Sequence, residues 1–433
     1  MKNNFDWSKY IKLESDKIKT LTSTFDANQI FAMGLMPVRG PKGFRKLDYE
    51  FANKKSNVIE IMDKLETHHF NVFGLVIKDT DGACVWDTKV GWNPVGRDIL
   101  GEFCDAGKDR NIRLMVSFTS MNDAYQGVIH PERVSIHGKS GKKSGIKYKK
   151  GDISTHEEGE MRIDLPEGVS LQEYQEKIPF LTNKYDIQQG KSRGSRGKGL
   201  ISSTSFMCPN SKHVDYLLNL TEEVVKNYSV GGFLADYIRY DGAFTDLCCC
   251  DRCIEKFTTN YGNKAKILKS QEWYRFKSET IAEYAQKLQT VIKKTRIDCT
   301  SGWFCLPGPK NMFSLKRLGQ DWTKLSSILD VASPMEYPYL MGTRDDGWYW
   351  RKVGDLFYWY FMRNMKKRIQ EFQSPVLAVT NSVECNSEEM LKQMRGFNFG
   401  LGIAVFKYFG TTDAQWIALK EYAENEIGLE NLN

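Results

Sequence analysis

The sequence predicts a (β/α)8 barrel, the architecture of a TIM barrel, and two observations support this prediction. Short apolar runs rich in β-branched and aromatic residues recur along the chain, as is typical of buried parallel strands. Longer amphipathic stretches separate them, which indicates that helices connect the strands. Eight such units in 433 residues favour one closed barrel. An open doubly wound sheet is the alternative, but no Gly-rich phosphate loop follows the first apolar run.

The predicted elements follow one another along most of the chain. The strands span residues 29–38, 71–79, 112–120, 231–238, 296–306, 329–337, 375–384 and 401–409. The predicted helices include residues 58–68, 97–110, 214–227, 276–294 and 387–397, and a last helix at 413–428 closes the barrel. Residues 1–28 are predicted to form a helical N-terminal extension, which leaves 29–433 for the barrel.

A long insertion is predicted after the third strand, at residues 121–207, and a Cys-rich loop after the fourth, at 243–262. The insertion contains two basic runs, 138–150 with six Lys and 188–200 with four Lys or Arg, and neither run contains an acid. Their ten charges exceed the formal net charge of +7, so the basicity belongs to this segment. Because the runs lack interleaved aromatics, we interpret them as solvated loops. Polyanion or RNA binding and a lid over a substrate cleft are the alternatives.

The beginning of the sequence is polar and charged, without the apolar core of a signal peptide. No window approaches the ~18 apolar residues of a membrane span. The sequence therefore predicts a cytoplasmic protein with no membrane partner, and it leaves a homo-oligomer open. Ten cysteines without an export signal indicate metal ligation or buried thiols rather than disulfides.

Active sites of such barrels lie at the carboxyl ends of the strands, which limits the candidate residues. Two carboxylates across the barrel mouth suit glycosidic bond cleavage, in which one protonates the leaving oxygen and the other attacks the sugar or activates water. The candidate catalytic carboxylates are Asp236, Glu336 and Glu384. The candidate substrate-binding residues are Lys78, Asp79, Asp81, Arg239, Trp303, Tyr337, Asn381 and Lys407. The six histidines form no HExxH or HxH motif, which disfavours a histidine-built metal hydrolase.

Each carboxylate also has a structural interpretation. Asp236 directly follows the apolar run GGFLA, and its alternative role is an ion pair with Arg239. Glu336 stands between two prolines in an aromatic segment, where a dry setting would raise the pKa of a general acid; its alternative role is to hydrogen-bond a loop. Glu384 precedes a predicted helix cap at Asn386 or Ser387, which makes it the weaker candidate. The aromatic residues near these strand ends suit a carbohydrate cleft, with core packing as the alternative.

Residues 206–257 contain FMCPNSKHVDYLL, then GGFLADYIRYDG, then CCCDRCIEKF. This segment resembles a family of glycoside-hydrolase-like barrels and also family 42 β-galactosidases, in which an upstream Cys joins a Cys cluster to hold zinc. The resemblance implies a structural zinc site, for which four thiolates are a suitable ligand set. Its implied ligands are Cys208, Cys248, Cys250 and Cys253, with Cys249 as an alternative to Cys248. Family 42 enzymes carry an Asn-Glu pair after the fourth strand, which is missing here.

Residues 74–116 are similar to the corresponding region of α-L-fucosidases, in which paired histidines contact the sugar where this chain has Asp79 and Thr80. In that family, and in α-amylase-like barrels, the fourth-strand Asp is the nucleophile, which implies this role for Asp236. SPMEYPYLMG and GIAVFKYFGTTDAQW are similar to the sixth and eighth strands of glycoside-hydrolase-like barrels. Together the resemblances imply a glycoside hydrolase acting on an oligosaccharide, polysaccharide or glycoconjugate. The alternatives are a catalytically inactive carbohydrate-binding barrel and, less favoured, a nucleic-acid-binding protein.

Overall fold

The computed structural model of the protein describes most of the barrel and parts of its loops. The described residues are 30–35, 56–80, 82–93, 96–136, 138, 163–164, 187–188, 206–241, 247–262, 267–268, 270–308, 310–338, 348–383, 385–398 and 400–429. The predicted N-terminal extension lies outside these residues. So do both basic runs, except for Gly138 and Gln188.

Eight parallel strands form the main sheet, and each lies within one of the predicted strands. They are β1 (Ile30–Leu35), β2 (Val72–Lys78), β3 (Arg113–Thr119), β6 (Gly232–Asp236), β7 (Thr300–Cys305), β8 (Val331–Pro334), β9 (Leu377–Asn381) and β10 (Gly402–Phe406). Their order is β8-β7-β6-β3-β2-β1-β10-β9. The bridges Ala332↔Val376 and Met335↔Val379 join the two outermost strands. The sheet therefore closes into the predicted (β/α)8 barrel, and the open sheet is excluded.

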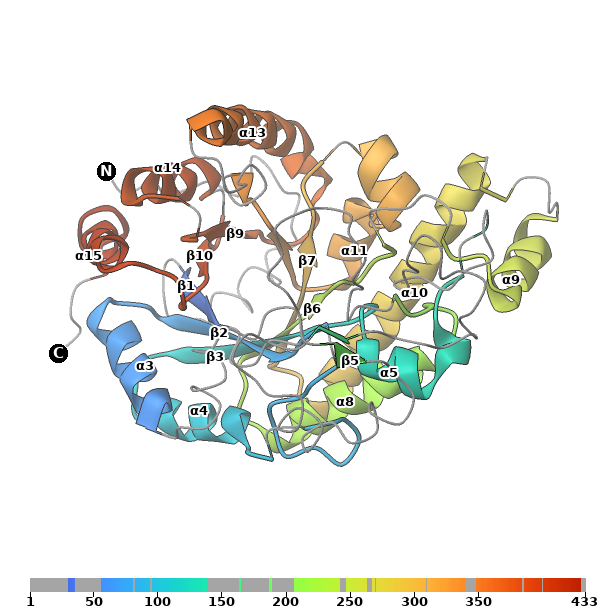
Figure 1. Ribbon diagram of the computed structural model, residues 1–433, viewed down its shortest axis with the longest axis horizontal. Helices are drawn as coiled ribbons and strands as arrows, with labels where there is room; N and C mark the ends of the chain where they lie inside the picture. Colours follow the sequence, from blue (N-terminus) through green and yellow to red (C-terminus); the bar gives the residue numbers. More distant parts are fainter. Residues whose placement is uncertain are drawn as a thin grey trace.

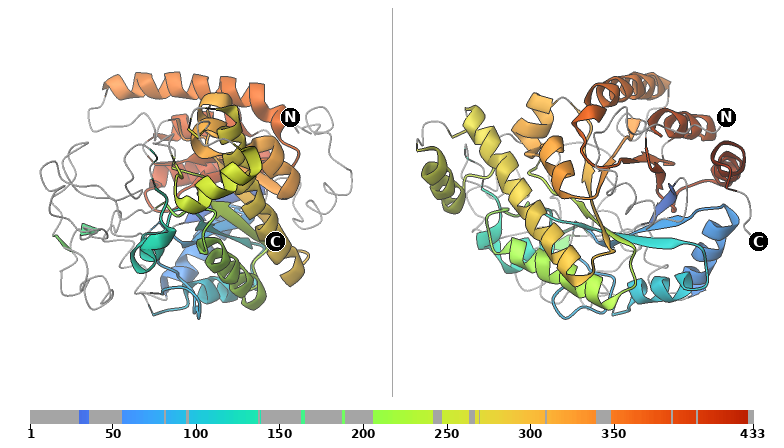
Figure 2. Two further views of the ribbon diagram at one scale, coloured as in Figure 1. Left: turned by 90° about the vertical axis from the view of Figure 1, so that its right-hand side faces the viewer. Right: turned by 180° about the vertical axis from the view of Figure 1, so that it is seen from behind.

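Helices cover the outside of the strands in a ring, which Figure 1 shows face on and Figure 2 shows from behind. The α-helices are α3 (Ser56–Thr67), α4 (Ile99–Gly107), α5 (Ala124–Ile129), α8 (His213–Asn227), α9 (Asp251–Tyr261), α10 (Gln271–Thr295), α11 (Trp322–Ile328), α13 (Trp348–Arg368), α14 (Ser387–Phe397) and α15 (Asp413–Tyr422). None of the helices in the described residues is long and apolar enough to cross a bilayer.

Short elements complete the described chain. They are the 3-10 helices η2 (Pro131–Arg133) and η5 (Ile369–Glu371), the π-helices η4 (Lys310–Leu318) and η6 (Ala423–Ile427), and the two-residue strands β4 (Ile163–Asp164) and β5 (Ile187–Gln188). β4 and β5 pair with each other, within the segment that the sequence assigns to the insertion.

The helix boundaries follow local capping chemistry. Asn386 caps α14 as predicted, because its side chain accepts a hydrogen bond from the Glu389 N–H while the Glu389 side chain accepts one from the Asn386 N–H. Thr412 and Gln415 form the same reciprocal pair at the start of α15. The predicted last helix is interrupted after Tyr422, where α15 passes into η6.

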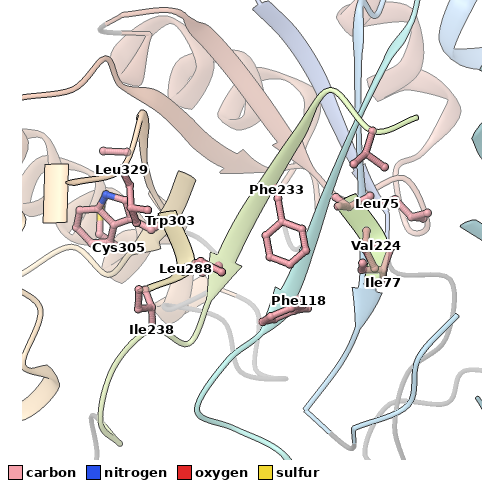
Figure 3. Close-up of a cluster of buried hydrophobic side chains, with 14 of the residues drawn as sticks. Leu75, Ile77, Phe118, Val224, Phe233, Ile238, Leu288, Trp303, Cys305 and Leu329 are labelled. Carbon is pink, nitrogen blue, oxygen red and sulfur yellow. The ribbon is translucent and has the colours of Figure 1, made fainter. Parts of the chain in front are cut away.

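The barrel wall separates two apolar regions. The larger region lies between the strands and the helices, and it includes Phe118 of β3 and Phe233 of β6. Their rings meet edge to face with centroids 4.7 Å apart. Figure 3 shows both side chains in this region. The smaller region contains residues from the inner side of the wall, among them Ile30, Met115 and Leu234. Alternate residues of one strand thus face the helices and the barrel interior.

Candidate active site

The barrel interior holds a cavity of about 530 Å³ to which all eight strands of the main sheet contribute. The side chains Ala32, Val72, Met115 and Leu234 make part of its wall apolar. Polar side chains gather on its wall at the carboxyl ends of the strands: Asp79, Thr80, Thr119, Asp236, Tyr237, Arg239 and Tyr337. A cavity of this size with a few convergent polar groups has the usual form of a small-molecule site.

Asp236 is the last residue of β6 and lies on the cavity wall. Its Oδ1 accepts a 2.6 Å hydrogen bond from the backbone N–H of Tyr237. Burial raises the pKa of Asp236 to about 6, although the Arg239 guanidinium and the Tyr237 N–H act in the opposite direction. A carboxyl group with this pKa is protonated in about a tenth of the molecules at pH 7 and in most of them at pH 5, so it can donate a proton to a substrate.

Tyr237 and Arg239 form the corner of the site that follows Asp236. The φ angle of Tyr237 is 49°, in the left-handed region that a non-glycine residue adopts at a sharp turn. Arg239 is buried, and its guanidinium carbon lies 4.2 Å from the centre of the Tyr237 ring. Both side chains line the cavity, so a cation on an aromatic face stands next to the candidate acid.

Aromatic rings form a second part of the wall. Phe304 lies within β7 on its cavity side, Tyr337 comes shortly after β8, and Phe406 is the last residue of β10. The rings of Tyr337 and Phe406 are nearly parallel, with an interplanar angle of 22° and centroids 6.1 Å apart. Flat apolar surfaces of this kind suit the C–H faces of a sugar ring.

The structure corrects the placement of Glu336. Because residues alternate along a strand, Met335 and Tyr337 face the cavity and Glu336 faces the surrounding helices. Glu336 is fully buried there, and among the residues that the structure describes neither of its carboxylate oxygens has a hydrogen-bond partner. Burial raises its pKa well above the ordinary value, with the Arg368 guanidinium opposing. Glu336 therefore keeps the dry setting predicted for it, but on the wrong side of the barrel wall to protonate a substrate.

Trp303 requires the same correction. Its neighbour Phe304 faces the cavity, whereas Trp303 is completely buried in the outer core. Its ring centroid lies 6.5 Å from that of Phe372, and Figure 3 shows it close to Cys305 and Leu329. Core packing, the alternative considered for these aromatics, is the role of Trp303.

Lys78 and Asp79 are neighbours in sequence but lie on opposite sides of the wall. Asp79 lines the cavity and is 8% exposed. Lys78 is fully buried outside the cavity, where its Nζ lies 2.9 Å from Asp123 Oδ2 and donates a 2.8 Å hydrogen bond to the Thr119 carbonyl oxygen. The structure thus places Asp79 on the cavity wall and Lys78 in a buried ion pair.

This ion pair leads to a stability prediction. Replacing Lys78 with Met leaves the Asp123 carboxylate buried without its counter-charge, so we expect the free energy of unfolding to fall by about 3 kcal/mol. Chemical denaturation measures the change. The matched control is Lys108→Met, which breaks a solvent-exposed pair with Asp105 and should cost less than about 0.5 kcal/mol. A loss below about 1 kcal/mol for Lys78→Met would contradict the stabilising role of the pair.

Of the four remaining predicted residues, two lie within the described residues and two do not. Asn381 is buried at the end of β9, where its side-chain amide donates to the Val383 carbonyl oxygen, and Lys407 is buried directly after β10. Neither is among the residues that line the cavity. The other two, Asp81 and Glu384, lie outside the described residues.

Sequence reasoning missed several cavity residues, namely Ser117, Thr119, Ser333 and Phe406. The sequence signal that could have identified them is their position, because each occupies one of the alternate positions of its strand that face the barrel interior. Thr119 pairs with Asp236 across β3 and β6, which places it beside a residue that the sequence did identify. Ser333 lies four residues before Tyr337, so it falls on the same side of its strand. Counting alternate positions back from Tyr337 would therefore have identified it as a cavity residue.

Cysteines from the Cys-rich loop after β6 and from the segment before α8 form a compact cluster. The Sγ atoms of Cys208, Cys248, Cys250 and Cys253 all lie within 4.8 Å of one another, and all four side chains are buried. Cys208 Sγ is 3.5 Å from Cys250 Sγ and 3.4 Å from Cys253 Sγ, distances too long for disulfides. Cys249 does not belong to this group. The structure therefore brings together the four cysteines that the resemblance implies.

The cluster connects separate segments of the chain. Cys250 caps the start of α9, and the Cys253 N–H donates to its carbonyl oxygen over 2.9 Å. The Cys208 N–H donates to the Arg133 carbonyl oxygen, and the Ile136 N–H points to Cys248 Sγ at 3.4 Å. Hydrogen bonds from the other three thiols, that of Cys208 first, lower the pKa of Cys250. None of the four cysteines lines the cavity.

Known glycoside hydrolases share this barrel. The glycoside hydrolase domain of PgaB (BpsB) from Bordetella bronchiseptica matches with a TM-score of 0.54 and 10% identity, over 94% of this chain and 99% of that domain. A β-galactosidase from Halorubrum lacusprofundi matches with a TM-score of 0.56 and 11% identity, over 91% and 57%. The α-L-fucosidase isoenzyme 2 from Paenibacillus thiaminolyticus matches with a TM-score of 0.51 and 13% identity, over 92% and 49%.

These likenesses establish the fold. The chain spans almost all of the Bordetella domain, but only about half the length of the β-galactosidase and the fucosidase. No protein-family model matches the sequence, and no curated protein matches it. The chemistry of this chain therefore has to be argued from its own residues.

Proposed function

We propose that this protein is a glycoside hydrolase that cleaves a glycosidic bond in an oligosaccharide, a polysaccharide or a glycoconjugate. The observation that carries the proposal is Asp236, a carboxyl group with a pKa of about 6 on the wall of a partly aromatic cavity. Its position at the carboxyl end of the fourth barrel strand is where such enzymes carry catalytic groups. The barrel shared with glycoside hydrolases supports the proposal.

Asp236 is suited to the role of general acid. It would give its proton to the glycosidic oxygen as the bond between that oxygen and the anomeric carbon breaks. The Arg239 guanidinium beside it would favour the carboxylate that remains after the transfer. Stacking on Tyr337 and Phe406 would orient the sugar ring. The predicted roles of Asp81 and Glu384, which lie outside the described residues, stay open.

We propose in addition that the cysteine cluster holds a structural zinc ion. Cys208, Cys248, Cys250 and Cys253 fit the four-thiolate set and close sulfur spacing of a tetrahedral site, in which zinc binds thiolates at ~2.3 Å. When bound, the ion would cross-link the segments that follow β3 and β6. The cluster would thus shape the rim of the cavity, while the carboxylates on its wall carry the chemistry.

The second candidate function is carbohydrate binding without catalysis. It is favoured by one observation, namely that Tyr237 and Ile238 follow Asp236 where family 42 enzymes carry an Asn-Glu pair. A panel of aryl glycosides and unlabelled oligosaccharides separates the two candidates, with hydrolysis followed by released phenol or reducing ends and binding by calorimetry. We expect cleavage of at least one member. Binding of sugars without any cleavage would establish the second candidate.

The acidity of Asp236 predicts the pH dependence of cleavage. The general acid is active in its protonated form, and the pKa of Asp236 is about 6. We therefore expect kcat/KM to be high below pH 6 and to fall about tenfold per pH unit well above it. The fall of kcat/KM above pH 6 is measured by recording the pH profile on a substrate with a poor leaving group. A rate that instead rises between pH 5 and 8 would show that Asp236 acts in its ionised form.

A further inference from the structure

We propose that Asp79 is the second catalytic carboxylate, turned into the cavity at the level of Asp236 by a β-bulge in β2, and that it acts as the general base of an inverting cleavage. This inference rests on the proposed glycosidase function and adds a residue and a stereochemical course to it. Within the described residues, Asp79 and Asp236 are the two carboxylates on the cavity wall.

The bulge decides which way Asp79 faces. Along β2, Val72, Gly74 and Val76 face the interior, so regular alternation would turn Lys78 inwards and Asp79 outwards. The pairing with β3 shifts at this point, because Val76 pairs with Ser117 and Lys78 with Phe118, leaving Ile77 as an extra residue. Ile77 and Lys78 both lie outside the cavity, and the alternation resumes one position later. A bulge of this kind re-aims a side chain next to a site.

The register then places the two carboxylates at one level of the barrel. Lys78 pairs with Phe118, so Asp79 follows at the level of Thr119, and Thr119 pairs with Asp236 on the other side of β3. β2 and β6 are thus two strand spacings apart, which separates their backbones by about 9.6 Å. Side chains that point inwards from a curved wall converge from this distance. The arrangement favours the wider carboxyl separation of inverting glycosidases, ~6.5–9.5 Å, which leaves room for a water molecule.

The contacts of Asp79 hold it in this orientation. The backbone N–H of Thr80 donates a 2.6 Å hydrogen bond to Asp79 Oδ1, and the Gly82 N–H donates to its carbonyl oxygen over 3.0 Å. Behind the wall, the Lys78 ammonium is fixed by Asp123 and by the Thr119 carbonyl oxygen. The residue before Asp79 is therefore anchored to β3 on the outer side, which keeps the bulge in place.

The two carboxyl groups complete a balanced hydrolysis. The Asp79 carboxylate takes a proton from a water molecule as the water oxygen forms a bond to the anomeric carbon. The bond from that carbon to the glycosidic oxygen breaks, its electron pair stays on that oxygen, and the Asp236 carboxyl group donates its proton there. Asp79 ends protonated and Asp236 ionised, and proton exchange with solvent restores both. The attack from the opposite face inverts the anomeric configuration.

The test compares Asp79→Asn with Asp236→Asn on two substrates of the same sugar, a dinitrophenyl glycoside and an alkyl glycoside. Because the base acts on the nucleophile, Asp79→Asn should lower kcat by about 10³-fold on both substrates. Because the acid acts on the leaving group, Asp236→Asn should spare the dinitrophenyl glycoside. Proton NMR of the wild-type reaction should show a first product of inverted anomeric configuration. Asp298→Asn, an exposed change at the opposite end of the barrel, is the control.

Rescue by azide distinguishes a catalytic role of Asp79 from a purely structural one, because azide would not restore activity lost through a change in structure. In Asp79→Ala, sodium azide should restore turnover of the dinitrophenyl glycoside, since this anion attacks without a base. An Asp79→Asn variant that keeps more than a tenth of wild-type activity would overturn the inference while leaving the proposed function in place. Retained anomeric configuration would overturn the role as base. A wild-type protein that cleaves no glycoside would overturn the proposed function and this inference with it.

Discussion

Replacing Asp236 with Asn should lower kcat/KM on an unactivated oligosaccharide by about 10³-fold, because a positioned general acid contributes 10²–10⁴-fold to such a rate. The same variant should be more stable than the wild type at pH 7. The folded state raises the pKa of Asp236 from 3.8 to about 6, so this group stabilises the fold below pH 4 and loses that contribution as the pH rises through 6. Removing the charge should therefore raise the free energy of unfolding by about 3 kcal/mol at pH 7.

Activity and stability are therefore expected to move in opposite directions, which separates a catalytic from a structural role. Steady-state kinetics measures the first, and denaturation at pH 4 and pH 7 measures the second, with the gain confined to pH 7. The control Asp298→Asn should change neither, since Asp298 is exposed. Full activity in Asp236→Asn would remove Asp236 from the mechanism. A stability loss at both pH values would assign it to the structural ion pair considered from the sequence.

Metal analysis of the purified protein should find about one zinc ion per chain. Removing it with a chelator, or replacing the buried ligand Cys250 with Ser, should lower the free energy of unfolding by 3 kcal/mol or more, on the order of losing a buried cross-link. Denaturation with and without added zinc measures the loss. Turnover per folded molecule should change much less, because the four cysteines lie away from the cavity wall.

The matched control is Cys249→Ser, which changes the neighbouring thiol outside the cluster and should leave zinc content unchanged. If protein prepared with zinc present contains no metal, the zinc proposal is wrong and the cluster consists of buried thiols. A Cys250→Ser variant with normal stability but no turnover would instead place the cluster in the chemistry.

The strands of the barrel could be predicted because their signal is local. Each run of apolar β-formers is bounded by polar residues, and eight such runs alternating with helices favour one closed barrel over an open sheet. The position of Asp236 followed for the same reason, since a charged residue directly after an apolar run must stand at a strand end. The cysteine ligands followed from a resemblance and not from composition, because ten cysteines allow many groupings.

What could not be predicted is the side of the wall on which a residue lies. Glu336 follows β8 and Trp303 lies within β7, yet each points outwards because a neighbouring residue occupies the inner position. A shift of one residue reverses this outcome, and the apolar composition of strands buried on both faces does not reveal it. Lys78 and Asp79 show most clearly that the sequence alone does not give the side of the wall. The extra residue before them, Ile77, is recognised only from the pairing of β2 with β3.

The cysteine cluster also bears on the order in which the chain can fold. Cys208 and Cys253 are 45 residues apart, and the segment between them comprises α8 and β6, including Asp236. A chain emerging from the ribosome would possess all four thiols before β7, β8, β9 and β10 were synthesised. Closing this loop early would remove conformational entropy from the unfinished chain and hold β6 ready to pair with β3. The half of the barrel that carries both cavity carboxylates could thus be assembled first, as a template on which the remaining strands add in sequence order.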